Sequence, residues 1–333
     1  RPNLTLWTHA QALRLTLEGK RVTGLVVRHE GREVTVKANR EVILSAGAVN
    51  SPHLLQLSGI GAPALLKANG VQPLHELPGV GENLQDHLQI RLIYECSRPI
   101  STNDALNSWL GRARLGLQWL LTRSGPLAVG INQGGCFMRA LPQESATPDI
   151  QFHVATLSAD MAGGQVHPFS GMTMSVCQLR PQSRGHIRIR SNDPFDPPEI
   201  QPNYLATELD RRTTVAGVRA ARAIARSPAM RPLLRREVKP GPTAGDDDEA
   251  LLAFCRDNGA TIFHPSGTCK MGPADDPLAV LDARLRVRGV AGLRVVDCSA
   301  MPTLVSGNTN APAVMMAEKA ADMIRADARA ARG

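Results

Sequence analysis

Two short, mainly apolar runs near opposite ends of the chain constrain its fold more than any other feature. The first, at 41–44, leads through a Ser-Ala-Gly-Ala turn into a pattern that predicts a helix beginning at Ser51, with Pro52 in its first turn and a stop at Gly59. The second run lies at 293–297. Apolar strands of this kind are typical of sheets that are covered on both faces. We therefore expect both runs to share one α/β sheet, with most of the chain inserted between them.

The residues before and between these runs follow other patterns. In the first forty residues, apolar and polar side chains alternate as they do in β-strands, and turn signals lie at 18–20 and 30–31. This pattern predicts a small antiparallel meander. The stretch 96–260 combines a helix expected around 104–123 with alternating runs such as DIQFHVATL and MTMSVCQL, a strand pair at HIRIRS and an Arg-rich helix. This α+β composition is suited to a lid or a substrate module over a sheet.

Composition and charge exclude several classes of protein. The length of 333 residues permits one large domain or two interleaved ones, and no apolar stretch approaches the roughly 18 residues that a membrane span requires. The formal net charge of +8 comes largely from arginines at 180–190 and 210–237, but aromatic residues make up only 3% of the chain. Nucleic-acid sites usually add aromatic side chains for stacking, so we expect solvated helices and no nucleic-acid partner.

The cysteines and the N-terminus bear on the compartment. Six cysteines lie far apart without a C-x-x-C pair, which predicts reduced thiols and neither disulfides nor a metal site. The first ten residues show neither a signal-peptide pattern nor a starting Met, which is typical of an internal point in a longer polypeptide. The expected location is the cytoplasm, with peripheral attachment to the inner membrane as the alternative.

The stretch TIFHPSGTCKMG (261–272) holds the most distinctive candidate residue, His264. Pro265 favours an extended backbone at the histidine, and the following Ser-Gly pair predicts a tight turn, so the imidazole would project from a rigid elbow. A neutral imidazole can accept a hydroxyl proton near pH 7, which indicates a general base; the alternative is a hydrogen-bonded core histidine. Cys269 has no partner base or resolving thiol nearby, so we expect it to serve packing.

A second candidate site lies in SGNTNAPAVMMAEKAADMI. Asn310 or Ala311 can cap a helix that carries Pro312 in its first turn, and the N–H groups at such a helix start favour an anion. Asn308 lies just outside the helix and could hold an oxygen substituent; the alternative is a simple capping loop. Two Gly-x-Gly runs, at 59–64 and 79–84, lack the third glycine and do not directly follow a strand, so they do not predict a nucleotide loop.

Four separated motifs resemble one known family. They are PGVGENLQDH, GAVNSPHLLQLSGIG, FHPSGTCKMG and VVDCSAMPTLVSGNTNAPAVMMAEKAADMI. Together with PDIQFHVATL and SRGHIRIRSNDPFDPPEIQPNYL, they resemble the glucose-methanol-choline (GMC) oxidoreductases, especially the choline-dehydrogenase-like bacterial members. The resemblance extends almost from end to end of the chain.

The resemblance implies oxidation of an alcohol to an aldehyde by hydride transfer to FAD. It makes His264 the base at the flavin and Asn308 the second polar residue of the active site. It also implies that six residues contact the cofactor, namely Ala12, Asp297, Cys298, Asn310, Ala311 and Pro312. No metal is implied. A flavin-free remnant that binds a small molecule or a protein is the rival hypothesis, and a hydrolase built on Ser266 lacks the Gly-x-Ser-x-Gly elbow.

The implied fold is α/β plus α+β, with part of an FAD-binding domain interleaved with a substrate domain of antiparallel sheet flanked by helices. We expect FAD-binding segments at 1–87 and 271–333 and a substrate-binding domain at 88–270. The family begins with a strand, a GxGxxG turn and a helix that hold the diphosphate, and this unit is missing before residue 1. We therefore expect a C-terminal portion, from truncation or cleavage, that is inactive alone and does not hold FAD tightly.

The substrate is less constrained than the chemistry. Quaternary ammonium groups are usually held by aromatic cages and a carboxylate, and the chain has only two Tyr and three Trp. A primary alcohol other than choline is therefore favoured. The sequence leaves open the electron acceptor, oxygen or a quinone-type carrier, and the oligomeric state.

Overall fold

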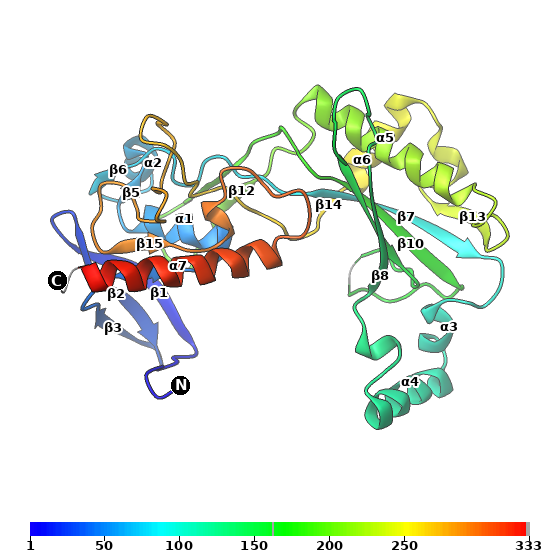
Figure 1. Cartoon of the computed structure of the whole chain (residues 1–333), viewed down its shortest axis with the longest axis horizontal. Helices are drawn as coiled ribbons and strands as arrows, with labels where there is room; N and C mark the ends of the chain where they lie inside the picture. The colour runs from blue at the N-terminus through cyan, green and yellow to red at the C-terminus, as the bar shows by residue number, and fades with distance from the viewer. Residues whose placement is uncertain (162, 331–333) are drawn as a thin grey trace. The chain divides into compact units, whose positions relative to one another are not determined.

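The computed structural model describes residues 1–161 and 163–330, and the chain forms two compact units (Figure 1). Unit 1 consists of Arg1–Asp86, Ser183–Tyr204 and Phe263–Gly333. Unit 2 consists of His87–Gln182 and Leu205–Ile262. Each unit is therefore assembled from segments that are far apart in the sequence.

Unit 1 begins with a three-stranded antiparallel sheet made of β1 (Ala10–Glu18), β2 (Arg21–His29) and β3 (Arg32–Lys37). The turns contain Gly19 at φ +57° and Gly31 at φ +77°, conformations that glycine adopts without a steric penalty. The meander predicted from the sequence is confirmed.

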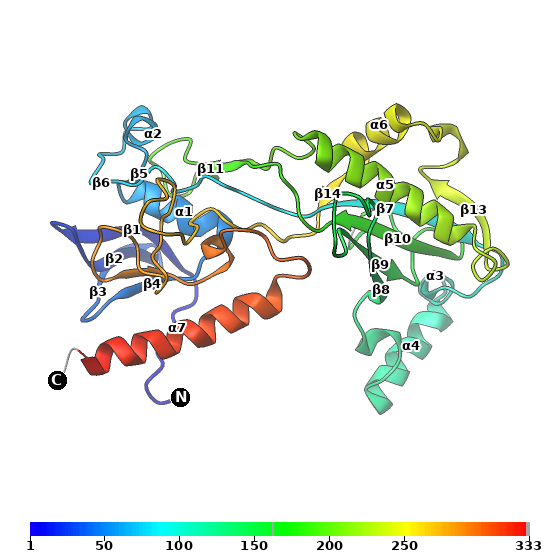
Figure 2. The same ribbon diagram turned by 45° about the horizontal axis from the view of Figure 1, so that its top comes forward.

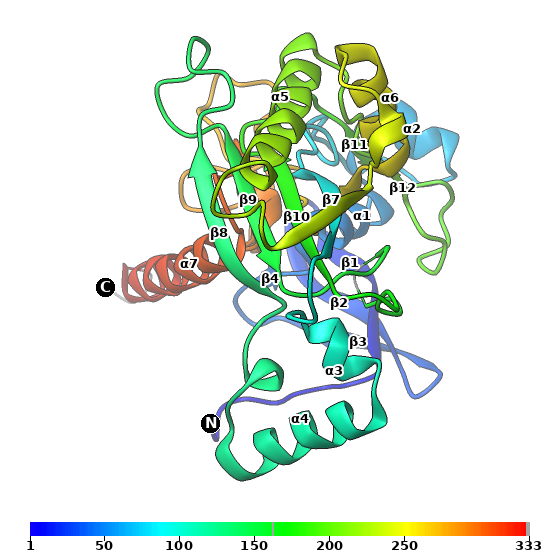
Figure 3. The ribbon, with the colours of Figure 1, turned by 90° about the vertical axis from the view of Figure 1, so that its right-hand side faces the viewer.

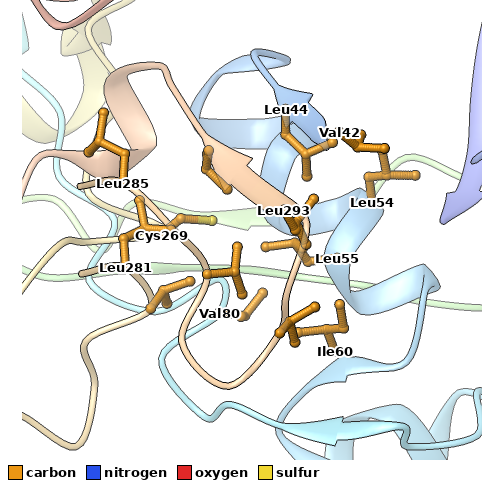
Figure 4. Packing of buried hydrophobic residues seen from close by; sticks show 14 of the residues in the cluster. Val42, Leu44, Leu54, Leu55, Ile60, Val80, Cys269, Leu281, Leu285 and Leu293 are labelled. Atoms are coloured by element: carbon orange, nitrogen blue, oxygen red, sulfur yellow. The ribbon is translucent and has the colours of Figure 1, made fainter. Parts of the chain in front are cut away.

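The two apolar runs pair as expected. Strand β4 (Val42–Leu44) lies parallel to β15 (Leu293–Val295), with Val42 opposite Leu293. Side chains of both strands pack against the helix α1 (Gly47–Leu57) in one buried cluster, which Figure 4 shows at close range. The cluster extends to Ala320 of the C-terminal helix, so both ends of the chain contribute to the same core.

Helix α1 begins at Gly47, which corrects the prediction of a start at Ser51. Pro52 therefore lies inside the helix, where it cannot donate a hydrogen bond to the carbonyl of Ala48. The hydroxyl of Thr268 donates to that carbonyl at 2.6 Å. A distant side chain thus supplies the bond that the proline removes, and the helix can start one turn earlier than its local sequence indicates.

The glycines of the two Gly-x-Gly runs fit close backbone packing. A Cβ added to Gly79 would lie 2.2 Å from the carbonyl oxygen of Leu278. Gly81 has φ +87°, and an added Cβ would lie 2.1 Å from the carbonyl oxygen of Ile187.

The smaller elements of unit 1 are α2 (Pro63–Ala68), the parallel pair β5 (Ile60–Gly61) and β6 (His75–Glu76), the antiparallel pair β11 (His186–Arg188) and β12 (Glu199–Gln201), and η3 (Cys298–Ala300).

The terminal helix α7 (Asn310–Ala330) runs alongside the strands of unit 1 (Figure 2). Asp327 binds the guanidinium groups of Arg284, at 2.6 Å, Arg286, and Arg294, at 2.6 Å. These three charges hold the pKa of the Asp327 carboxyl well below its usual range. Arg294 is buried and also binds Glu41 at 2.7 Å, which links α7 to the strand pair β4 and β15.

Unit 2 is built on a six-stranded antiparallel sheet in the order β13-β7-β10-β9-β8, with β14 also paired to β7. The strands are β7 (Leu88–Cys96), β8 (Asn132–Met138), β9 (Ile150–Ala155), β10 (Gly171–Gln178), β13 (Leu234–Lys239) and β14 (Ala260–Thr261). Helices α5 (Glu208–Ala225) and α6 (Asp248–Asn258) lie over one face of this sheet (Figure 3). Asp247 caps α6 by accepting from the N–H of Ala250.

Two domain boundaries and one helix differ from the sequence-based expectation. The segment 183–204, expected in the substrate-binding domain, packs in unit 1 because Gln56 of α1 donates to the carbonyl of Ile187 at 3.0 Å and accepts from the N–H of Ile189 at 2.9 Å. Residues 263–270 also belong to unit 1.

The helix expected around 104–123 is two helices, α3 (Thr102–Leu106) and α4 (Trp109–Thr122), because Ser108 between them caps α4. A short 3₁₀ turn, η1 (Pro126–Ala128), precedes β8, and another, η2 (Pro242–Ala244), precedes α6.

Candidate active site

His264 lies in a buried loop whose backbone is held by a carboxylate. The N–H of His264 donates to Asp86 at 2.9 Å, and the hydroxyl of Tyr204 donates to the other oxygen of the same carboxylate. The histidine is only 8% exposed. Burial lowers its pKa, and the charge of Asp86 partly opposes this change. The imidazole is therefore neutral near pH 7, which is the protonation state that a general base requires.

Phe263, immediately before the histidine, has a strained backbone. Its φ of +64° lies in the left-handed region, which bulky residues rarely adopt, and its side chain is 76% exposed. Such a conformation costs on the order of 1–3 kcal/mol and persists only where neighbouring contacts enforce it. Strain of this kind is concentrated at functional sites, so it supports the choice of this loop as the candidate site.

The turn after the histidine is closed against the segment 83–86. Gln85 and Ser266 exchange two backbone hydrogen bonds, of 3.0 and 2.9 Å. Gly267 has φ +91°, and a Cβ there would lie 2.6 Å from the carbonyl oxygen of Asn83, so glycine is required. The hydroxyl of Ser266 is fully buried and donates to the main-chain oxygen of His264 at 3.2 Å. It has the role of a turn residue, which gives no support to the hydrolase alternative.

Gln85 also holds the loop that leads to Asn308. Its side-chain amide donates to the carbonyl of Pro302 at 3.2 Å and accepts from the N–H of Leu304 at 3.1 Å. Because its main chain is bonded to Ser266, this one buried residue connects the His264 loop with the Asn308 loop. Asn308 itself is exposed.

The stretch after the turn runs beside η3. The N–H of Gly267 donates to the carbonyl of Cys298 at 3.1 Å, and the N–H of Cys269 donates to that of Ser299 at 2.9 Å. Cys269 is fully buried in the unit 1 core, and burial raises the pKa of its thiol well above the ordinary value. The expected packing role of this cysteine is confirmed.

Asp297, predicted to contact the cofactor, has a carboxylate that four groups of the chain already occupy. One oxygen accepts from the N–H and the hydroxyl of Ser299, at 2.8 and 2.5 Å. The other accepts from the N–H of Gly47 at 2.9 Å and the hydroxyl of Ser51 at 2.6 Å. The side chain therefore joins η3 to the start of α1.

The remaining predicted cofactor residues fall into two groups. Asn310 and Ala311 are exposed and Pro312 is half-buried in the first turn of α7, where the N–H of Ala313 donates to the carbonyl of Thr309 at 3.0 Å. Of the other two, Cys298 contacts the residue directly before this turn and Ala12 lies apart from it. Cys298 bonds to Thr309, and burial raises the pKa of its thiol, whereas Ala12 lies on β1 and packs half-buried against the unit 1 core.

Sequence reasoning assigned no role to Asn83, Gln85 and Asp86, which position the loop in the structure. They lie in PGVGENLQDH, which was identified only as a family motif. The sequence did contain a sign of this positioning role, because five of the six residues from 82 to 87 are polar and directly precede an apolar strand. Exposed loops are often polar, but this segment is largely buried, so its side chains need partners within the fold.

Comparison with known proteins identifies related chains across nearly all of this one. Two models described as GMC oxidoreductase match residues 1–89 and 181–317. The oxygen-dependent choline dehydrogenase of Staphylococcus aureus (strain JH9) is 43% identical over 98% of this chain and 57% of its own length.

Solved structures also match nearly the whole of this chain. The pyridoxine 4-oxidase from Mesorbium loti matches 97% of this chain and 58% of its own, with 30% identity and a TM-score of 0.81. The formate oxidase from Aspergillus oryzae RIB40, described in connection with modification of its FAD, matches 98% of this chain and 61% of its own, with 26% identity and a TM-score of 0.89. The chain thus spans less than two thirds of the length of these relatives.

Proposed function

The chain belongs to the GMC oxidoreductase family, and we propose on that premise that it forms the substrate-binding and catalytic part of an FAD-dependent enzyme that oxidises a primary alcohol to an aldehyde. The observation that carries the proposal is the buried loop at His264. Its backbone is fixed by Asp86, its imidazole has a lowered pKa, and the preceding residue is strained. Burial lowers the pKa of any core histidine, so the carboxylate on the main chain and the strained neighbour are the features that favour an active-site histidine.

The residues present fit one end of FAD and not the other. The N-terminus of α7, with exposed Asn310 and Ala311 and no large side chain in its first turn, offers N–H donors and a positive dipole end to an anionic group. This suits the pyrimidine end of a flavin. In the part of the chain that the structure describes, the glycines at 79 and 81 are closed against Leu278 and Ile187 and offer the diphosphate no matching loop. We therefore propose that this chain alone binds FAD weakly and has no turnover.

Two residues of this chain would handle the alcohol. His264, neutral near pH 7, accepts the hydroxyl proton on its imidazole. Asn308 donates an amide hydrogen bond to the oxygen on which negative charge develops. FAD, when bound, supplies the two-electron acceptor for the hydride that leaves the alcohol carbon. Loss of one proton and one hydride converts the primary alcohol to the aldehyde.

One face of the unit 2 sheet, in the domain expected from the sequence to bind the substrate, carries polar side chains. Arg91, Ser175 and His153 lie directly opposite one another on three neighbouring strands. Burial lowers the pKa of Arg91, whose guanidinium donates to the side chain of Gln89 at 3.3 Å, and no carboxylate of the described residues lies within ion-pair distance of it. A quaternary ammonium group prefers carboxylates and aromatic cages. We propose a neutral or anionic alcohol in preference to choline.

The direct test uses the complete polypeptide. The protein should purify with flavin absorbance, and anaerobic addition of a primary alcohol should bleach that absorbance. A colourless protein that gains no flavin absorbance on reconstitution would contradict the enzymatic proposal and favour a flavin-free binding module. Comparing choline with aliphatic, aromatic and carboxylate-bearing alcohols tests the substrate class separately, because a strong preference for choline would contradict only that part.

A further inference from the structure

A cavity of about 730 Å³ lies in unit 2, where the end of α5 meets the edge strand β13. Residues of β7, α5, β13 and the loop before α6 form its wall. The wall contains five arginines, namely Arg222, Arg226, Arg231, Arg235 and Arg236. The sequence predicted solvated helices for the arginine-rich stretch 210–237, but the fold gathers these five side chains around one space. The proposed oxidation gives them no role.

The cavity lies on the face of the unit 2 sheet that is opposite to Arg91. Tyr94 of β7 lines the cavity and stands three residues after Arg91 on the same strand. Residues an odd number apart on a strand point to opposite faces of the sheet. Helix α5 packs on the Tyr94 face, because a Cβ added to its Gly217 would lie 2.9 Å from the side chain of Val176, which pairs with Ile90. A ligand in this cavity would therefore not contact the polar face that carries Arg91.

The buried part of the wall is held by one hydrogen-bonded network. The guanidinium of Arg222 is buried and binds Glu237 at 2.8 Å and Asp246 at 2.5 Å. It also donates to the carbonyl of Gly245 at 2.8 Å. The hydroxyl of Tyr94 donates to Glu237 at 3.4 Å, and burial raises the pKa of this hydroxyl, so it stays neutral at pH 7. A wall fixed in this way lowers the entropic cost of binding a ligand.

Two arginines of the wall, Arg226 and Arg231, have no close carboxylate partner. Arg226 lies 3.7 Å from Asp246, whose carboxylate is already bound to Arg222. Arg231 forms no ion pair with a carboxylate of the described residues. Its main chain is nevertheless fixed, because its N–H donates to the carbonyl of Ser227 at 2.9 Å. Both guanidinium groups are exposed and can bind an anion without giving up a close ion pair.

The charges of the wall do not balance. Arg235 and Arg236 share one carboxylate, that of Glu95, at 2.9 and 2.6 Å. Five positive guanidinium groups thus face three negative carboxylates, which leaves a net charge of +2; the carboxylates are those of Glu95, Glu237 and Asp246. A phosphate monoester carries a charge of about −1.5 to −2 at pH 7, whereas a single carboxylate carries only one charge. Its oxygens also match the forked donors of arginine.

We propose that this cavity binds a phosphorylated small molecule, with the phosphate held by Arg226 and Arg231. Its volume exceeds the need of a free phosphate ion and lies within the range of about 300–1,000 Å³ that is usual for organic ligands. The apolar part of the wall offers contact to the organic group through Tyr94, Ala225, Leu234 and Pro242. The inference does not depend on the proposed oxidation, because no residue of this wall takes part in it.

Isothermal titration calorimetry of the complete polypeptide tests the site, with phenyl phosphate and inorganic phosphate as probes. We expect saturable binding of phenyl phosphate that is tighter than that of inorganic phosphate, because the apolar wall contributes. Phenol, which lacks the anion, should bind at least tenfold more weakly than phenyl phosphate. The double variant Arg226→Gln, Arg231→Gln should weaken phenyl phosphate binding about tenfold or more, since it removes two charged donors and leaves the buried network of Arg222 intact.

The matched control is the double variant Arg114→Gln, Arg212→Gln. Both arginines are exposed residues of unit 2 outside this wall, and Arg212 lies on the same helix α5. The control removes the same charge and should leave phenyl phosphate binding within about twofold of the parent. An equal loss in the control would show a general attraction of the basic chain for anions and contradict the proposal.

Three other results would also overturn the proposal. One is the absence of binding by both phosphate probes. Another is full affinity in Arg226→Gln, Arg231→Gln, which would place the phosphate elsewhere in the polypeptide. The third is a crystal structure of the complete polypeptide in which its own chain fills the cavity. Phenyl phosphate seen against Arg226 and Arg231 in such a crystal, together with the expected loss in the variant, would support the proposal.

Discussion

The two loops that carry the proposed catalytic residues are held in different ways. The His264 loop is buried, and a carboxylate, a glutamine and an asparagine from the segment 83–86 fix its main chain. The Asn308 loop is exposed at its functional residue and is held through Pro302 and Leu304, several residues earlier. The difference fits the proposed roles, because burial lowers the pKa of His264 and would keep a base neutral, whereas an amide that only donates a hydrogen bond tolerates solvent.

The largest expected effect is at the base. Replacing His264 with Ala in the complete enzyme should slow flavin reduction by about 100-fold or more, the usual range for removal of a positioned acid–base group. FAD content should stay near that of the parent. Stopped-flow absorbance under anaerobic conditions measures the rate. Flavin reduction at the parent rate with every alcohol tested would rule out His264 as the base.

The second effect tests the residue that connects the two loops. Gln85→Ala removes two hydrogen bonds to the Asn308 loop and leaves the carbonyl of Pro302 and the N–H of Leu304 without this partner. We expect a loss of about 1–3 kcal/mol in the free energy of unfolding, because the N–H of the buried Leu304 loses its partner, whereas the carbonyl of Pro302 still accepts from Asn83 at 3.3 Å.

Chemical denaturation measures this loss, with Gln11→Ala as control because the amide of Gln11 makes one exposed local contact. If Gln85→Ala were as stable as the control, the two loops would not depend on a common support.

The amide should matter less than the base. Asn308→Ala should lower the rate of flavin reduction by about tenfold, since it removes one hydrogen bond to developing charge and no proton acceptor. Asn308→His keeps a donor and should retain more activity than Asn308→Ala. A loss larger than that of His264→Ala would reverse the proposed roles of the two loops.

The smallest effect concerns the pH dependence of the base. The charge of Asp86 raises the pKa of His264, against the lowering by burial, so Asp86→Asn removes the raising contribution and leaves an oxygen that can still accept from the His264 N–H. Activity that requires neutral imidazole is lost as pH falls through this pKa.

The acidic limb of the rate profile should therefore move to lower pH in Asp86→Asn, by less than about one unit. A shift to higher pH would show that the carboxylate does not act on His264 through its charge.

Local patterns were sufficient for much of unit 1. The meander could be predicted from alternation and two glycine turns, and α7 from its capping sequence, because the causes lie within a few residues of each other. The apolar runs also predicted that β4 and β15 share one sheet, but not that they pair directly and in parallel, and Ile43 of β4 is exposed on one face. The catalytic roles of His264 and Asn308 came from the family motifs and remain predictions.

What the sequence by itself determined is the set of elements, the apolar strands that meet in one core, and the family to which the motifs belong. Only the tertiary structure decided where α1 begins, which side chains fix the His264 loop, and which arginines surround the cavity at the end of α5. The physical reason is distance along the chain. Thr268 completes a helix 220 positions away, and Asp86 holds a main-chain N–H 178 positions away. Periodicity and capping describe neighbours in sequence, whereas such partners are set by the packing of the whole fold.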